Sequence, residues 1–415
     1  MLGAFRTLPT LDLLKEADIL PVSLSLQDQI RKNIIRIQTL PTNNPMTLWF
    51  ERAQQMHIAK IKPFSNLERL MDENMTTTDL TECILPHIRP PWWENPIKID
   101  IPIDKELAIE KHNQTAEANR EDPDTICIYT DGSGINNAIA AAAHDPATEL
   151  TAHQYMGPAN LTNVFAAELV GVKTAIEMAK QQNKQRCYIF ADSQAAIRAA
   201  HNPRKQSGQY ILAEIADLAD NLVRINPKAT ITIQWTPGHK GVPGNEKADE
   251  EAKRAAIEQL GKQKHPKLKS KLIEQANATT AAASKALWAK GAIHHTHHRR
   301  ISKPSYVQFG NKLYDGLTRR NTATLVRLRT GHCSLNNYLN RFRITESPEC
   351  QCGHTTETVR HYVMECPLYN NQRNELQKAV GARNFRLERL LGQKKYLEHT
   401  LRYVNTTNRF SNTQE

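Results

Sequence analysis

The order of short apolar runs and amphipathic segments between residues 124 and 257 constrains this fold most. Three strand-like runs (126–130, 138–143 and 150–155) come first, and a helical segment follows at 164–180. A buried strand at 186–191, helical stretches at 193–201 and 210–224, a strand at 230–235 and a helix from about residue 245 complete the series. Helices interspersed with strands have to cover a sheet. The pattern therefore predicts an α/β domain with a mixed five-stranded sheet and flanking helices.

Four acidic residues stand where such a sheet can bring them together. Asp131 follows the first strand, Asp192 ends the fourth, Glu168 lies in an apolar helical context, and Asp249 lies on the last helix. Hydrolysis of a phosphodiester by two divalent ions needs several hard oxygen ligands that converge from distant positions. Taken singly, each acid also fits an ordinary turn, helix cap or surface charge. The prediction of two Mg²⁺ or Mn²⁺ ions therefore depends on their joint arrangement.

Four motifs in this region resemble type 1 ribonuclease H. They are Tyr-Thr-Asp-Gly-Ser (129–133), Ala-Glu-Leu (167–169), Ala-Asp-Ser-Gln (191–194) and Trp-Thr-Pro-Gly-His-Lys-Gly-Val-Pro-Gly-Asn-Glu-Lys-Ala-Asp (235–249). The resemblance implies cleavage of the RNA strand of an RNA–DNA hybrid, with Asp131 bridging both ions. It also implies that His239 helps to deliver water or release product, although a solvated loop histidine is the alternative. The same resemblance puts four further residues near the hybrid: Ser133, Ser193, Gln194 and Asn245.

Charge is distributed unevenly along the chain. The formal net charge is +11, and residues 259–330 hold fifteen Lys and Arg against two acids. Residues 124–257 are nearly neutral, with thirteen basic and fourteen acidic residues. A concentrated basic segment is the electrostatic feature expected of a polyanion binder. We therefore expect residues 258–330 to add affinity for nucleic acid, with a solvated helical linker as the alternative.

Four residues near the C-terminus have the types and spacing of a closed zinc site. They are Cys350, Cys352, His361 and Cys366, and three thiolates with one imidazole suit structural, tetrahedral Zn²⁺. The Cys-x-Cys spacing is shorter than usual, so reduced cysteines without metal are the alternative. Seven cysteines, an odd number, make a disulfide framework improbable. They favour a reducing, intracellular compartment, nuclear or cytoplasmic.

The two ends of the chain are similar to the C-terminal part of non-LTR retrotransposon polyproteins. The similarity rests on Thr-Gly-His-Cys (330–333), the Cys-x-Cys-Gly after it, Glu-Cys-Pro (365–367) and Leu-Gly-Ala-Phe-Arg-Thr-Leu-Pro-Thr (2–10). It implies helices that follow a reverse transcriptase, then ribonuclease H, then a Cys/His module. No Tyr-x-Asp-Asp polymerase signature occurs in the sequence. The chain is therefore expected to correspond to the polymerase-less C-terminal part of such an element, and a reverse transcriptase is a candidate partner.

The expected organisation has six segments. They are a helical region (1–85), a Pro-rich linker (86–123), the ribonuclease H domain (124–257), a basic helical linker (258–330), a Cys/His zinc module (331–370) and a helical or disordered tail (371–415). No apolar run approaches about 18 residues, so no membrane span is expected. Two other functions compete with a hybrid-specific endoribonuclease: a non-catalytic, nucleic-acid-binding retrotransposon remnant and a DDE-type recombinase. The Gly-His loop and the Asp-Ser-Gln stretch favour ribonuclease H over the recombinase.

Overall fold

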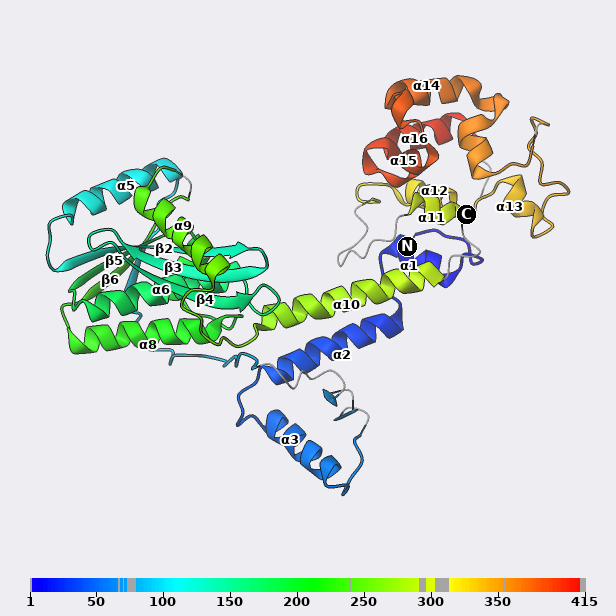
Figure 1. The fold of residues 1–415 in the computed structure, drawn as a ribbon. Helices are drawn as coiled ribbons and strands as arrows, with labels where there is room; N and C mark the ends of the chain where they lie inside the picture. Colours follow the sequence, from blue (N-terminus) through cyan, green and yellow to red (C-terminus); the bar gives the residue numbers. More distant parts are fainter. Residues whose placement is uncertain are drawn as a thin grey trace. The chain divides into compact units, whose positions relative to one another are not determined.

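The chain divides into two compact units (Figure 1). The computed structural model describes residues 2–65, 68–69, 71–72, 80–238, 240–290, 296–302, 313–353 and 355–410. The unit formed by Ile30–Ala276 is called the sheet unit here, and the unit formed by Met1–Gln29 with Asn277–Glu415 is called the split unit. The sheet unit is therefore inserted, in sequence, between the two parts of the split unit.

The sheet unit contains a six-stranded sheet in the order β1-β6-β5-β2-β3-β4. Its strands are β1 (Ile97–Asp100), β2 (Thr125–Ile135), β3 (Ala138–Asp145), β4 (Leu150–Pro158), β5 (Arg186–Ala191) and β6 (Thr230–Trp235). Strands β2, β3 and β4 form an antiparallel meander, whereas β1, β6, β5 and β2 pair in parallel. The predicted mixed α/β class is confirmed, but the predicted number of five strands was one too few.

The additional strand, β1, comes from the segment predicted to be a Pro-rich linker. Ile97 is only 1% exposed and aligns with Ile231 of β6, so β1 covers what would otherwise be the edge of the sheet. Helix α5 (Lys105–Ala118) follows, and the Asp104 side chain caps it by accepting a 2.8 Å hydrogen bond from the Leu107 N–H. A strand of four residues between prolines is too short to show a period in the sequence. Residues 97–118 thus belong to the sheet unit's folded body.

Helices cover both faces of the sheet. They are α6 (Val164–Gln181), α7 (Gln194–His201), α8 (Gln209–Ile225) and α9 (Pro243–Glu258). A further helix of the sheet unit, α3 (Pro45–Ile58), precedes the strands in the sequence. Successive residues of a strand point to opposite faces. Accordingly, Ile128 joins the main core with α6, α7 and α8, whereas Tyr129 packs with Val242 and Ala248 of the α9 region. The α9 region and α6 therefore enclose the central strands from opposite sides.

The split unit is helical in its described part. It contains α1 (Thr10–Ala17), α11 (Thr296–Ile301), α12 (Arg319–Thr330), α13 (Asn336–Asn340), α14 (Asn370–Val380), α15 (Leu387–Gly392) and α16 (Lys394–Thr406). Helices α2 (Val22–Gln38) and α10 (Lys269–Lys290) each run through a boundary between the units. Residues 258–330, expected as one basic linker, are thus divided between the two units. No helix in the described part combines the length and apolarity needed to cross a membrane.

A buried ionic cluster fixes α1 within the split unit. Glu16 accepts a 2.9 Å hydrogen bond from Arg329 Nε, and its Oε1 lies 2.5 Å from His298 Nε2. The other ring nitrogen of His298 lies 2.6 Å from Asp12 Oδ1. Burial alone would lower the pKa of His298, but its hydrogen bonds to Asp12 and Glu16 raise it. Because buried charges are tolerated only when paired, the cluster requires segments from both ends of the chain.

Candidate active site and Cys/His centre

The fold brings three of the four predicted acids together at one end of the central strands. Carboxylate oxygens of Asp131, Glu168 and Asp192 all lie within 4.8 Å of one another. Asp131 lies in β2 and Asp192 directly follows β5, and these strands pair in parallel with Thr130 opposite Ala191. Parallel strands in register deliver the residues at their carboxyl ends to one edge of the sheet. Helix α6, which packs beneath β2, adds the third acid.

Asp249, the fourth predicted acid, is not part of this group of three. Its Oδ2 accepts a 2.7 Å hydrogen bond from Lys253 Nζ, one turn further along α9. The charge of Asp249 still acts on the group, because it raises the pKa values of Asp131 and Glu168. Lys253 was not predicted as a site residue, although its i,i+4 spacing from Asp249 indicates a contact on one helix face. The ammonium group of Lys253 offsets part of the negative charge.

Burial and mutual repulsion hold two of these acids toward their neutral forms. Burial, followed by the charges of Asp192 and Asp249, raises the pKa of Asp131 to about 7. Burial, followed by the charges of Asp131 and Asp192, raises the pKa of Glu168 well above its usual value. Within the described part of the chain, Glu168 Oε2 is buried without a hydrogen-bond partner. A buried, unsatisfied carboxylate oxygen beside other carboxylates fits a hard divalent cation such as Mg²⁺ or Mn²⁺.

Two glycines allow the backbone to approach the acids closely. A Cβ atom added at Gly132 would lie 2.5 Å from the Glu168 nitrogen, and one added at Gly238 would lie 2.6 Å from Asp192 Oδ2. The indole Nε1 of Trp235 donates a 3.0 Å hydrogen bond to the main-chain carbonyl of Asp192. The end of β6 is therefore tied to the acid that ends β5, and larger residues at either glycine would separate the groups.

The residues predicted to lie near a nucleic acid have different environments. Ser193 is the N-cap of α7, and Gln194 begins that helix half-buried. Ser133 is buried in β2. Asn245 is buried in the first turn of α9, and among the described residues its Oδ1 has no hydrogen-bond partner. His239, the predicted assistant in catalysis, lies outside the described residues.

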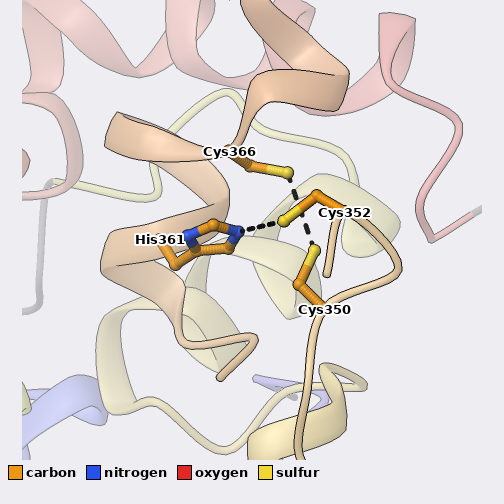
Figure 2. A group of neighbouring side chains, drawn as sticks. All are labelled: Cys350, Cys352, His361 and Cys366. Carbon is orange, nitrogen blue, oxygen red and sulfur yellow. Dashed lines mark hydrogen bonds between the residues drawn. The ribbon is translucent and has the colours of Figure 1, made fainter. Parts of the chain in front are cut away.

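The second candidate centre lies in the split unit and gathers all four predicted zinc ligands (Figure 2). Cys350 Sγ lies 3.6 Å from Cys366 Sγ, and Cys352 Sγ lies 3.3 Å from His361 Nε2. One ligand atom from each of the four residues lies within 4.8 Å of the others. Tetrahedral zinc with Zn–S bonds of about 2.3 Å separates its sulfur ligands by roughly 3.8 Å. The donor set and its spacing therefore fit Zn²⁺.

Two local turns build this centre. The Cys350 N–H donates to the Thr355 carbonyl at 2.8 Å, and Gly353 adopts the left-handed φ of +73° that this tight loop requires. The π-helical turn His361–Glu365 ends with the Cys366 N–H donating to the His361 carbonyl at 2.8 Å. Burial raises the pKa of the Cys350 thiol to about 12. A bound cation would favour the thiolate form.

Three solved structures show similarity over about a third of this chain. Ribonuclease H1 from the halophilic archaeon Halobacterium salinarum is 17% identical, with a TM-score of 0.26, over 33% of this chain and 99% of that chain. The N-terminal ribonuclease H domain of a Mycobacterium tuberculosis protein was solved as a fusion with maltose-binding protein. It is 18% identical, with a TM-score of 0.26, over 32% of this chain and 94% of that chain. LC11-RNase H1, solved with an RNA/DNA hybrid, is 20% identical, with a TM-score of 0.27, over 32% of this chain and 99% of that chain.

Sequence comparisons assign part of the sheet unit to a family. The chain is 42% identical over 45 residues to the retrovirus-related Pol polyprotein from type-1 retrotransposable element R1 of Bradysia coprophila. That stretch is 11% of this chain, and the match spans only 4% of the polyprotein's length. Residues 123–257 match the family model of RNase H, and they contain all four predicted acids. The predicted resemblance is therefore confirmed, and residues 123–257 of this chain form a ribonuclease H domain.

Proposed function

We propose that this chain hydrolyses the RNA strand of RNA–DNA hybrids by two-metal-ion catalysis. The main support is the group of carboxylates of Asp131, Glu168 and Asp192, whose oxygens lie within 4.8 Å of one another inside a ribonuclease H domain. One of these oxygens, Glu168 Oε2, is buried and has no hydrogen-bond partner among the described residues. The proposed metal ligands are Asp131, Glu168, Asp192 and Asp249. Divalent ions bound there would supply an activated water and neutralise charge at the scissile phosphate.

The chain's own residues prepare this site before any ion binds. Burial of Asp131 and Glu168 excludes water, which strengthens every electrostatic interaction at the carboxylates. The hydrogen bond from Trp235 to the Asp192 carbonyl fixes the backbone of the third acid. Lys253 offsets part of the negative charge of Asp249 through their 2.7 Å contact while no ion is bound. Little reorganisation is therefore needed when ions and substrate bind.

Recognition of RNA is assigned to short polar groups around the acids. An RNA-specific cut requires contacts with 2′-hydroxyl groups in a wide, shallow minor groove. The buried Oδ1 of Asn245, which lacks a partner among the described residues, is an acceptor suited to a hydroxyl donor. Ser133, Ser193 and Gln194 are the other proposed contacts, and His239 is proposed to assist water delivery or product release.

Affinity for the phosphate backbone is assigned to the split unit. This unit contains 24 Lys and Arg against 13 Asp and Glu, whereas the sheet unit contains 30 of each. The whole net charge of +11 therefore belongs to the split unit. Contacts between basic residues and phosphates supply most non-specific affinity for nucleic acids. Zn²⁺ held by Cys350, Cys352, His361 and Cys366 would stabilise this unit without taking part in catalysis.

Cleavage by the full-length chain with Mg²⁺ tests the proposal. RNA in a labelled hybrid should be cut, and duplex DNA and single-stranded RNA should be spared. Asp192→Asn should slow cleavage by about a hundredfold to a thousandfold. Glu258→Gln, which removes an exposed acid at the end of α9, is the matched control and should cleave like wild type. Equal inactivity of wild type and Asp192→Asn would refute the enzymatic function and favour a non-catalytic nucleic-acid binder.

A further inference from the structure

An exposed tip on the split unit combines apolar and basic side chains that the proposed cleavage chemistry does not use. It follows α13 and reads Arg341-Phe342-Arg343-Ile344. Phe342 is 46% exposed and Ile344 is 67% exposed. Arg341 and Arg343 are also exposed, and neither forms an ion pair within the described part of the chain. Phe342 lies between the two arginines and Ile344 follows them, so the tip alternates exposed basic and apolar side chains and is a candidate interaction site.

The tip is held in a closed turn. The Leu339 carbonyl accepts hydrogen bonds from the N–H groups of both Phe342, at 3.0 Å, and Ile344, at 3.1 Å. Asn340 Nδ2 donates to a main-chain carbonyl five residues further on, at 3.0 Å. Arg343 adopts a left-handed φ of +56°, which is strained for a residue with a side chain and persists only where its surroundings hold it. The backbone of the tip is therefore ordered before a ligand binds, which reduces the backbone entropy that is lost on binding.

Phe342 of the tip contacts a series of aromatic rings in the split unit. The rings of Phe342 and Tyr338 have centroids 5.2 Å apart, and those of Tyr338 and Phe5 are 5.8 Å apart and stacked at 18°. The guanidinium carbon of Arg327 lies 4.5 Å from the centroid of the Phe5 ring. A half-exposed aromatic ring beside arginines is the arrangement with which proteins stack a base and neutralise its flanking phosphates.

The surroundings favour a single-stranded nucleic acid as the ligand. The split unit carries the entire net charge of +11, which attracts polyanions, and the two exposed acids that follow the tip, Glu346 and Glu349, reduce this positive charge only locally. Insertion into a membrane would require a broad apolar face, whereas only two apolar side chains project here. A duplex keeps its bases stacked on one another, so only an unpaired strand offers a base face to Phe342.

We propose that the Arg341–Ile344 tip binds single-stranded nucleic acid, with Phe342 stacking on a base and Arg341 and Arg343 contacting the adjacent phosphates. The proposal rests on the proposed function to the extent that both concern nucleic acid. The tip would bind the unpaired strand that flanks a hybrid, whereas the ribonuclease H domain would cleave the hybrid itself.

Binding of the full-length chain to fluorescein-labelled (dT)15, measured by anisotropy against salt concentration, tests this site. Phe342→Ala should weaken binding by about 5- to 150-fold, which is the range for loss of one stacked base. Phe342→Tyr should bind like wild type because it keeps the ring. Leu368→Ala removes an exposed apolar side chain elsewhere in the same unit and is the matched control. Arg341→Gln combined with Arg343→Gln should reduce the salt slope by about 1.4.

Three results would overturn the tip site. The first is wild-type affinity of Phe342→Ala for (dT)15, and the second is equal loss of affinity in Leu368→Ala. The third is that the tip variants lose binding to phosphatidylserine vesicles but keep their affinity for (dT)15, which would identify a membrane surface as the ligand. Cleavage of a blunt-ended hybrid by wild type is scored separately. If wild type cleaves the hybrid but Phe342→Ala binds (dT)15 as tightly as wild type, only the tip site is refuted. If wild type does not cleave the hybrid but its binding to (dT)15 depends on Phe342, only the nuclease function is refuted.

Discussion

The two candidate metal centres of this chain are assembled in opposite ways. The acids come from β2, α6, the end of β5 and α9, so they meet only after the sheet has formed. The Cys/His ligands come from one loop and one helical turn between residues 350 and 366. The first centre is thus a product of the completed fold, and the second is local. We expect metal loss to stop chemistry at the first centre and to unfold the structure around the second.

Removing Zn²⁺ should have the largest effect on stability. Cys366→Ser should bind less than one equivalent of zinc and lose more than about 5 kcal/mol of unfolding free energy in the split unit, because structural zinc contributes its binding energy to folding. Zinc analysis and thermal denaturation measure both quantities. Removal of Mg²⁺ should leave the sheet unit folded. Cys83→Ser, at an exposed cysteine of the sheet unit, is the control, and equal substoichiometric zinc in both proteins would eliminate the site.

Ile97→Ala should have the next largest effect, confined to the sheet unit. Ile97 is fully buried in the main core, so its truncation should cost about 2–5 kcal/mol. Denaturant titration followed by cleavage assays would measure the loss, while the zinc content should not change. Lys98→Ala, at the neighbouring exposed position of β1, should be nearly neutral. Equal stability of the two variants would show that β1 is only a linker, as the prolines suggested.

Glu168→Gln should stabilise the sheet unit in Mg²⁺-free buffer. The pKa of Glu168 is raised in the folded protein, so the folded state binds more protons than the unfolded state and its stability falls as pH rises. The neutral amide removes this cost, so the variant should be more stable than wild type at pH 8. The gain should shrink at pH 5.5, because a lower pH favours the protonated carboxyl in the folded protein. Denaturant curves at both pH values check the sign, and a larger gain at pH 5.5 would contradict it.

Lys253→Gln should produce the smallest change. Lys253 competes with cations for the charge of Asp249, but the pair is partly exposed and worth only about 0.2–1 kcal/mol. Its loss should raise Mg²⁺ affinity by about 1.4- to 5-fold in calorimetric titrations. Lys247→Gln removes a lysine of the same helix that pairs with Glu250 and Glu251, and it should leave Mg²⁺ affinity unchanged. A weaker Mg²⁺ affinity in Lys253→Gln would assign that lysine a supporting role instead.

The sequence predicted the elements whose residues carry a visible pattern. The apolar period placed the central strands and α6, and the family motifs identified acids far apart in the chain. It missed β1, because pairing with β6 rather than any local pattern makes residues 97–100 a strand. It also missed the joining of α1 to α11 and α12, which depends on buried contacts such as that between Glu16 and Arg329. Contacts of this kind leave no periodic trace in a single sequence.

The split unit has a consequence for synthesis on the ribosome. Glu16 of α1 and its partner His298 are separated by 282 positions. At about 5–20 residues per second, a ribosome needs on the order of 15–60 s to make the intervening chain. The whole sheet unit emerges during that interval and can fold while α1 still lacks its partners. Helix α1 is translated before the sheet unit but reaches its final contacts only after His298 has been made, and chaperones can bind its acidic residues, Asp12 and Glu16, during that interval.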